Sequence, residues 1–137
     1  MNNEKETALL VSLDSINLCI LRDVVSGLGY VASRTKDIKS AKLLIEKQHF
    51  RLFILDVSSI DQLSEYLSLV NFIKDCKFNC LIIILLNRLN SEKYSWICGE
   101  GVNEIVTKPI TSAAFTDKIG CLKIGQSIGA KTSFLLQ

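Results

Sequence analysis

The stretch Arg51-Leu52-Phe53-Ile54-Leu55-Asp56 decides the fold of this chain. Four apolar residues run without a polar interruption and end on a carboxylate. A short run of this kind predicts a β-strand that is buried on both faces. Such strands belong to parallel sheets covered by helices, and ligands of these sheets collect at the carboxyl ends of the strands. We therefore expect Asp56 to lie at the functional edge of a parallel sheet.

Four more strand patterns occur along the chain, and a helical pattern follows each strand. The other predicted strands are Thr7–Leu13, Tyr30–Ser33, Cys80–Leu86 and Glu104–Thr107. The predicted helices run from Asp14 or Ser15 to Gly27, from Asp37 through Ile45, from Asp61 to Cys76, from Asn90 to Gly99, and from Thr111 or Ser112 to Ile124. Short connections between alternating strands and helices are typical of parallel βαβ units. The predicted fold class is α/β, a three-layer (βα)5 doubly wound parallel sheet with the flavodoxin-like order 2-1-3-4-5.

Length and composition indicate one globular domain. The chain has 137 residues, of which 48% are hydrophobic and 22% charged, as in an average folded domain. The net charge of +2, from 16 basic and 14 acidic residues, favours neither a nucleic acid nor a membrane surface as a partner. The longest apolar run, Cys80–Leu86, is far shorter than the roughly 20 residues that span a bilayer. The polar start of the chain does not resemble a signal peptide.

The cysteines indicate a cellular compartment but do not form a recognisable metal site. Their number, five, is odd, and no CxxC pair occurs. Cys76 and Cys80 are four residues apart, but no second pair or nearby histidine completes a zinc site. Reduced thiols of this kind are typical of the cytoplasm, where we expect the protein to act.

Three stretches carry a resemblance to a known family. They are Phe53-Ile54-Leu55-Asp56, Ile82-Ile83-Ile84-Leu85, and Gly101 to Ile110, which ends in Thr-Lys-Pro-Ile. On these stretches the chain, over about nine-tenths of its length, resembles the receiver domain of two-component response regulators. The resemblance predicts a receiver-like domain over residues 1–126 and a C-terminal tail or the start of a linker over residues 127–137.

The resemblance implies a reaction and its residues. Receivers take a phosphoryl group from a phosphohistidine onto an aspartate, with a divalent metal to offset the charge. Asp56 matches the phosphoacceptor, and Lys108 matches the lysine that pairs with the phosphate or with the aspartate. Pro109 matches a proline whose preceding peptide bond is often cis. The implied protein is a signalling module of a phosphorelay and not an enzyme.

The resemblance also implies partners. A histidine kinase or a phosphotransfer protein would supply the phosphoryl group. A downstream protein would bind the face formed by the fourth helix, the fifth strand and the fifth helix. Tyr94 and Trp96 belong to that fourth helix and either contact a partner or pack against the sheet. A homodimer is also compatible with the resemblance, whereas nucleic acid and membrane are not expected partners.

Four positions depart from the family pattern. Ser12 and Leu13 stand where receivers carry two metal-binding acids at the end of the first strand. Leu86 stands where a serine or threonine binds the phosphate, and Ile105 replaces the usual aromatic residue of the fifth strand. Leu86 has no polar atom in its side chain, so a phosphate would lose a hydrogen bond worth about 1–3 kcal/mol.

These departures predict a degenerate receiver. Asp56 and Asp14 are the only carboxylates left as candidate metal ligands, so Mg²⁺ binding and phosphorylation of Asp56 should be impaired. A purely structural role for Asp56, as the partner of Lys108, is the other interpretation of this residue. Two alternatives to the receiver function remain open. They are a flavodoxin-like domain that binds a small ligand, although no glycine-rich loop follows the first strand, and a phosphorylation-independent scaffold within a larger sensor kinase or regulator.

Overall fold

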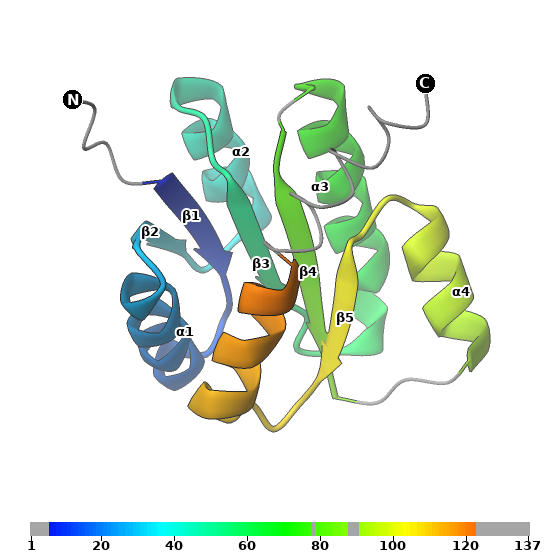
Figure 1. Ribbon diagram of the computed structural model, residues 1–137. Helices are drawn as coiled ribbons and strands as arrows, with labels where there is room; N and C mark the ends of the chain where they lie inside the picture. The colour runs from blue at the N-terminus through cyan, green and yellow to red at the C-terminus, as the bar shows by residue number, and fades with distance from the viewer. Residues whose placement is uncertain (1–5, 78, 88–90, 123–137) are drawn as a thin grey trace, which may run out of the picture.

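The computed structural model describes residues 6–77, 79–87 and 91–122. They form one parallel sheet covered by helices on both faces (Figure 1). The strands are β1 (Glu6–Val11), β2 (Tyr30–Thr35), β3 (Leu52–Asp56), β4 (Leu81–Leu86) and β5 (Glu104–Thr107). The helices are α1 (Ser15–Gly27), α2 (Ile38–Lys47), the 3₁₀ turn η1 (Ile60–Gln62), α3 (Leu63–Asp75), α4 (Ser91–Gly99) and a helix over residues 112–122.

The order of the strands is β2-β1-β3-β4-β5, and all neighbouring pairs are parallel. This confirms the predicted doubly wound α/β fold with its flavodoxin-like order. β3 is the central strand, and its five residues are all buried. Each aliphatic side chain buried here contributes roughly 1.5–3 kcal/mol to folding, so the strand that the sequence singled out anchors the sheet.

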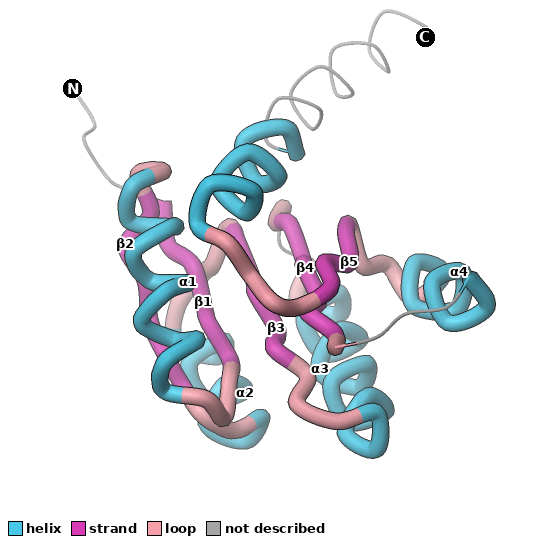
Figure 2. The backbone as a smooth tube through the Cα atoms, turned by 90° about the horizontal axis from the view of Figure 1, so that it is seen from below, coloured by secondary structure: helices cyan, strands magenta, loops and turns pink. Residues whose placement is uncertain are grey.

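Side chains of successive residues on β3 and β4 pack into two separate cores. Phe53 and Leu55 belong to one core, which includes residues of α2, α3 and α4. Leu52 and Ile54 belong to the other, which includes residues of α1 and of the helix over residues 112–122. Figure 2 shows these two layers of helices on opposite faces of the sheet. The three-layer arrangement follows from this alternation.

The boundaries of some elements differ from the sequence prediction. β1 ends at Val11 rather than at Leu13, because pairing with β2 ends at Thr35, to whose oxygen the Ser12 N–H donates, and the side chain of Leu13 is half exposed. The predicted helix from Asp61 is a 3₁₀ turn followed by α3 from Leu63. The predicted start of a helix at Asn90, the end of the last helix at Ile124, and the boundary between residues 126 and 127 lie outside the described residues.

Candidate functional site

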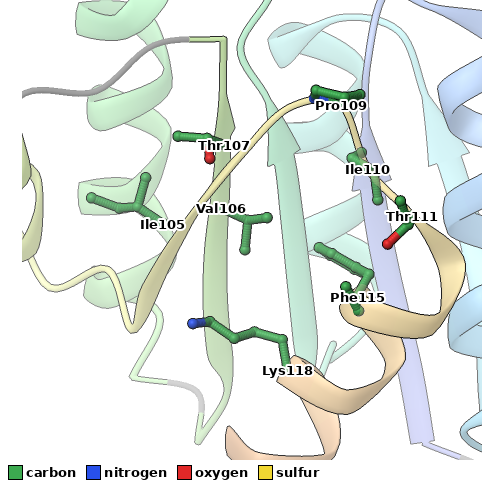
Figure 3. A pocket seen from close by; sticks show the side chains of 9 residues that line it. Ile105, Val106, Thr107, Pro109, Ile110, Thr111, Phe115 and Lys118 are labelled. Atoms are coloured by element: carbon green, nitrogen blue, oxygen red, sulfur yellow. The ribbon is translucent and has the colours of Figure 1, made fainter.

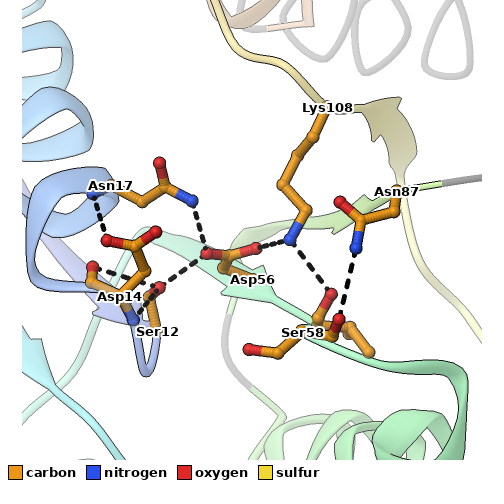
Figure 4. Close-up of polar contacts among 8 residues, drawn as sticks. Ser12, Asp14, Asn17, Asp56, Ser58, Asn87 and Lys108 are labelled. Carbon is orange, nitrogen blue, oxygen red and sulfur yellow. Dashed lines mark hydrogen bonds and ion pairs between the residues drawn. The ribbon is translucent and has the colours of Figure 1, made fainter.

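Asp56 ends β3 and lies at the carboxyl edge of the sheet, between β1 and β4 (Figure 4). The residue is only 1% exposed. A buried carboxylate is stable only when its oxygens accept hydrogen bonds or pair with a cation. The identity of its partners therefore defines what this site can do.

Lys108 is the charged partner of Asp56. Its Nζ lies 2.7 Å from Asp56 Oδ1 and also donates to the Val57 oxygen at 3.2 Å. The backbone N–H of Lys108 donates to the Leu86 oxygen at 2.8 Å, which fixes the base of the side chain beside β4. The Lys108–Pro109 peptide bond is cis, as the resemblance implied. The two candidate residues predicted from the sequence thus meet as a buried ion pair.

The second oxygen of Asp56 accepts two neutral donors. The Ser12 hydroxyl donates to Oδ2 at 2.6 Å, and the Asn17 side-chain amide donates to the same atom at 3.0 Å (Figure 4). The sequence analysis named Ser12 only as a position where receivers carry an acid. It did not name Asn17 as a site residue. The spacing of α1 contains a signal for Asn17, because it lies four residues before Leu21 and seven before Val24, which are both buried on the face that turns towards the sheet.

Asp14 serves the start of α1. Its Oδ1 accepts the backbone N–H groups of Ile16 at 2.9 Å and Asn17 at 3.3 Å, so Asp14 is the N-cap of the helix. N-cap carboxylates satisfy donors that the first helical turn leaves without a partner. Capping therefore accounts for Asp14 without a metal ion.

The groups around Asp56 do not fit Mg²⁺, which takes oxygen ligands from carboxylates, phosphates and water. The Ser12 hydroxyl, the Asn17 amide and the Lys108 ammonium all direct hydrogens at the carboxylate. Among residues 6–77, 79–87 and 91–122, no group of three or more His, Cys, Asp or Glu side chains could hold a metal ion. Asp56 is instead satisfied by donors of the chain itself.

On the side of β4 and β5, the residues near the Asp56 site are apolar. Leu86, at the end of β4, is buried in the core beside α3 and α4, as is Ile105 of β5. Next to Leu86, the Asn87 amide donates to the Ser58 oxygen at 3.2 Å and ties the loop after β3 to the end of β4 (Figure 4). Asn87 thus offers an amide near the site, one residue beyond the position of Leu86.

The negative charge of Asp56 affects the pKa of Tyr66. The residue lies on α3 and is 3% exposed. Burial raises the pKa of its hydroxyl from 10.0 to about 12, and the negative charge of Asp56 adds to this effect. Tyr66 therefore stays neutral in the folded protein well above the pH at which a free tyrosine ionises.

A second surface feature lies at the opposite end of the molecule from α1 (Figure 1). Tyr94 and Trp96 on α4 are 42% and 48% exposed. A hollow of about 360 Å³ opens between β5 and the helix over residues 112–122, and Phe115 is among the residues that line it (Figure 3). At this hollow, Lys118 forms an ion pair with Glu104, with its Nζ 3.4 Å from Glu104 Oε2.

None of the helices in the described part of the chain is long and apolar enough to cross a membrane.

The order of the five parallel strands is the flavodoxin-like order 2-1-3-4-5, which is also the order in CheY. No family model and no curated protein matches this chain. Solved structures do. A response regulator from Thermotoga maritima superposes with a TM-score of 0.77 at 14% identity, covering 87% of this chain and 98% of that one.

Two other structures show the same likeness. The chemotaxis protein CheY4 of Vibrio cholerae gives a TM-score of 0.76 at 16% identity, over 87% of this chain and 99% of that one. A response regulator from Burkholderia pseudomallei, solved with a phosphorylated aspartic acid, a calcium ion and citrate, gives 0.69 at 14% identity, over 96% and 75%. The predicted resemblance to receiver domains is therefore confirmed at the level of the fold.

Proposed function

We propose that this protein is a signalling module of the two-component type, acts through contacts with other proteins, and is impaired in phosphorylation at Asp56. It is not an enzyme in this proposal, and neither nucleic acid nor membrane is a partner. A histidine kinase or phosphotransfer protein is the input partner, and the protein also forms a homodimer. The free cysteines of the described residues support action in the cytoplasm, where thiols stay reduced.

The observation that carries the proposal is the set of donors on Asp56. Its two oxygens accept three hydrogen bonds from Ser12, Asn17 and Lys108, and the residue is 1% exposed. A phosphoryl group or metal on Oδ2 would have to displace the Ser12 and Asn17 bonds, each worth about 1.5–3 kcal/mol to a charged acceptor. The Burkholderia protein carries its phosphoryl group on an aspartic acid in the same fold class. In the present chain the corresponding reaction would start from a carboxylate that already accepts three hydrogen bonds from the chain itself.

The output surface in this proposal is the face of α4, β5 and the helix over residues 112–122. Exposed Tyr94 and Trp96 provide aromatic groups of the kind that dominate binding at protein interfaces. The hollow beside β5 could take an apolar side chain of the downstream protein (Figure 3). Ile105 is buried beneath this face, so the aromatic residue that receivers usually use to couple it to the phosphate is missing.

The test is phosphorylation by a small phosphodonor. The protein is treated with acetyl phosphate and Mg²⁺, and its intact mass is measured. We expect little or no gain of a phosphoryl group. Asp56→Asn is the control for modification elsewhere, and the double variant Ser12→Asp with Leu13→Asp, which supplies the two acids, should gain more than the parent. Near-complete addition of one phosphoryl group to the parent, absent in Asp56→Asn, would refute the impaired site.

A phosphorylation-independent scaffold is the second candidate function, and the same three hydrogen bonds on Asp56 favour it. The two candidates differ in their response to a histidine kinase. A relay module binds the kinase near Asp56 and loses that binding when the edge is altered, for example by Ser58→Arg. A pure scaffold keeps all its partners in this variant and loses them only with Trp96→Ala.

A further inference from the structure

A further hollow opens at the carboxyl edge of the sheet, beside the Asp56 site. Its volume is about 300 Å³, at the lower end of the range for small-molecule sites. The loop after β3, from Val57 to Ile60, forms part of its lining, and Leu86 and Asn87 at the end of β4 form another part. Lys93, in the first turn of α4, completes the lining. Three separate segments of the chain thus surround this space, the β3–β4 hollow.

Hydrogen bonds within the chain fix the residues that line the hollow. The Asn87 amide donates to the Ser58 oxygen at 3.2 Å and ties the two loops together (Figure 4). The Val57 N–H donates to the Leu85 oxygen at 3.0 Å, and the Val57 oxygen accepts Lys108 Nζ at 3.2 Å. A site that is fixed before binding loses little conformational entropy when a ligand enters. The hollow is therefore preorganised for a ligand.

The polar part of the lining offers hydrogen-bond donors. Lys93 supplies an ammonium group, and Ser58 and Ser59 supply hydroxyls. Within the described part of the chain, neither hydroxyl takes part in a hydrogen bond, and Ser59 does not cap η1. None of the described residues that line the hollow is acidic, and Asp61, which follows Ile60 directly, is not part of the lining. An ammonium group and two hydroxyls without a carboxylate among them fit an oxyanion.

The rest of the lining is apolar. Val57 and Leu86 are buried, whereas 46% of Ile60 is exposed. An apolar group that covers Ile60 would remove this surface from water, which favours binding. Inorganic phosphate can use only the polar part of the lining, whereas an oxyanion with an organic group can use both parts.

We propose that the β3–β4 hollow binds a small organic oxyanion, a phosphate ester or a carboxylate, without a covalent bond to Asp56. Lys93 pairs with the oxyanion, the two serine hydroxyls donate to it, and its organic group contacts Ile60. Because Lys93 belongs to α4, the ligand contacts the helix that carries Trp96 of the proposed output surface. Such a ligand is an input that needs neither the two missing acids nor a hydroxyl at Leu86. The inference rests on the proposed function only for this output.

Calorimetric titration of the whole chain without Mg²⁺ tests the inference. The probes are phenyl phosphate, benzoate and inorganic phosphate. Phenyl phosphate should bind with a Kd of about 1 mM or lower, and inorganic phosphate about tenfold more weakly, because it has no organic group. The tighter of phenyl phosphate and benzoate shows which oxyanion the site prefers. Trp96 is the only tryptophan of the chain, so its fluorescence should change on binding if the ligand affects α4.

Variants locate the site. Lys93→Gln, and Ser58→Ala combined with Ser59→Ala, should each weaken phenyl phosphate binding about tenfold, with circular dichroism showing that the variants are folded. Ile60→Ser should weaken phenyl phosphate and leave inorganic phosphate unchanged. The matched control is Lys47→Gln, at an exposed lysine of α2, which should bind phenyl phosphate like the parent.

Two results would overturn the inference. They are the absence of binding by every probe at about ten times the expected Kd, and equal binding of phenyl phosphate by the parent and Lys93→Gln. Neither result bears on Asp56. Conversely, phosphorylation of Asp56 by acetyl phosphate would refute the proposed impairment and leave ligand binding in the hollow standing.

Discussion

One carboxylate connects four segments of this chain at the residue scale. Asp56 of β3 receives Ser12 from the end of β1, Asn17 from α1 and Lys108 from the segment after β5. Hydrogen bonds to a buried charge are stronger than neutral ones, and leaving such a charge unpaired is costly. The Asp56 site is therefore a structural junction as well as a candidate functional site.

Removing the carboxylate should destabilise the fold. Asp56→Ala leaves the Lys108 ammonium, whose side chain is 13% exposed, without its partner. The free energy of unfolding should fall by about 3–5 kcal/mol, the usual effect of breaking one side of a buried pair. Urea denaturation measures this change. Asp61→Ala, at an exposed acid a few residues later, should stay within about 0.5 kcal/mol of the parent. Equal stability of Asp56→Ala and the parent would contradict this structural role of Asp56.

Tyr66 makes stability depend on pH at the alkaline end. Its pKa is about 12 in the folded protein and 10.0 when free, so above pH 10 the unfolded chain loses a proton that the folded chain keeps. Stability should fall as the pH rises from 10 to 12, by on the order of 2 kcal/mol for this residue. Urea denaturation at several pH values, with reductant present, should show a smaller decline in Tyr66→Phe. Identical declines in the two proteins would count against this assignment.

At the scale of elements, α1 carries several roles on different sides. Its start is capped by Asp14, Asn17 bonds to Asp56, and the inner residues fill the core below β1. The N-cap fixes the first turn and hence the direction of the Asn17 side chain. The cap therefore supports the Asp56 site indirectly.

Loss of the cap should be measurable apart from any metal effect. Asp14→Ala removes the acceptor for the N–H groups of Ile16 and Asn17 and should cost about 1 kcal/mol in thermal or urea unfolding. Asp14→Asn keeps an acceptor oxygen and should cost much less. Both variants should behave alike in Mg²⁺ titrations. A loss of Mg²⁺ affinity in Asp14→Asn that exceeds its loss of stability would instead make Asp14 a metal ligand.

In the whole molecule, α1 and α4 lie on opposite sides of the central strand. α1 lies on the side of the β2 edge, α4, which carries Tyr94 and Trp96, lies on the side of the β5 edge, and β3, which ends at Asp56, is the central strand (Figure 2). A rigid sheet with two cores separates the two helices.

Mg²⁺ should leave the stability of the whole molecule unchanged. A ligand raises stability only when it binds the folded state, and the Asp56 carboxylate is already occupied by donors of the chain. The thermal midpoint should be the same with Mg²⁺ and with a chelator. Ser12→Asp places a second carboxylate beside Asp56, so it should lower the midpoint without metal and recover part of the loss with Mg²⁺. A parent that gains as much from Mg²⁺ as this variant would contradict the expectation.

Much of the fold could be predicted from local patterns. Leu52–Leu55 and Ile82–Leu85 are apolar without interruption because strands buried on both faces have no solvated side, and their alternation with helices restricts the order of the strands. The position of Asp56 at the sheet edge and its proximity to Lys108 follow from the same topology. The separation of η1 from α3 could not be predicted, because both have similar local sequence preferences.

The sequence by itself determined that Asp56 ends a central strand, that Ser12 and Leu13 at the end of the first strand are not acidic, and that the side chain of Leu86 cannot form a hydrogen bond. These are properties of residue type and order along the chain. Only the tertiary structure decided that the Ser12 hydroxyl and the Asn17 amide both donate to Oδ2 of Asp56, and that Asp14 caps its own helix. The reason is physical: Asn17 and Asp56 are 39 residues apart, and whether two such polar groups meet depends on how α1 packs against the sheet.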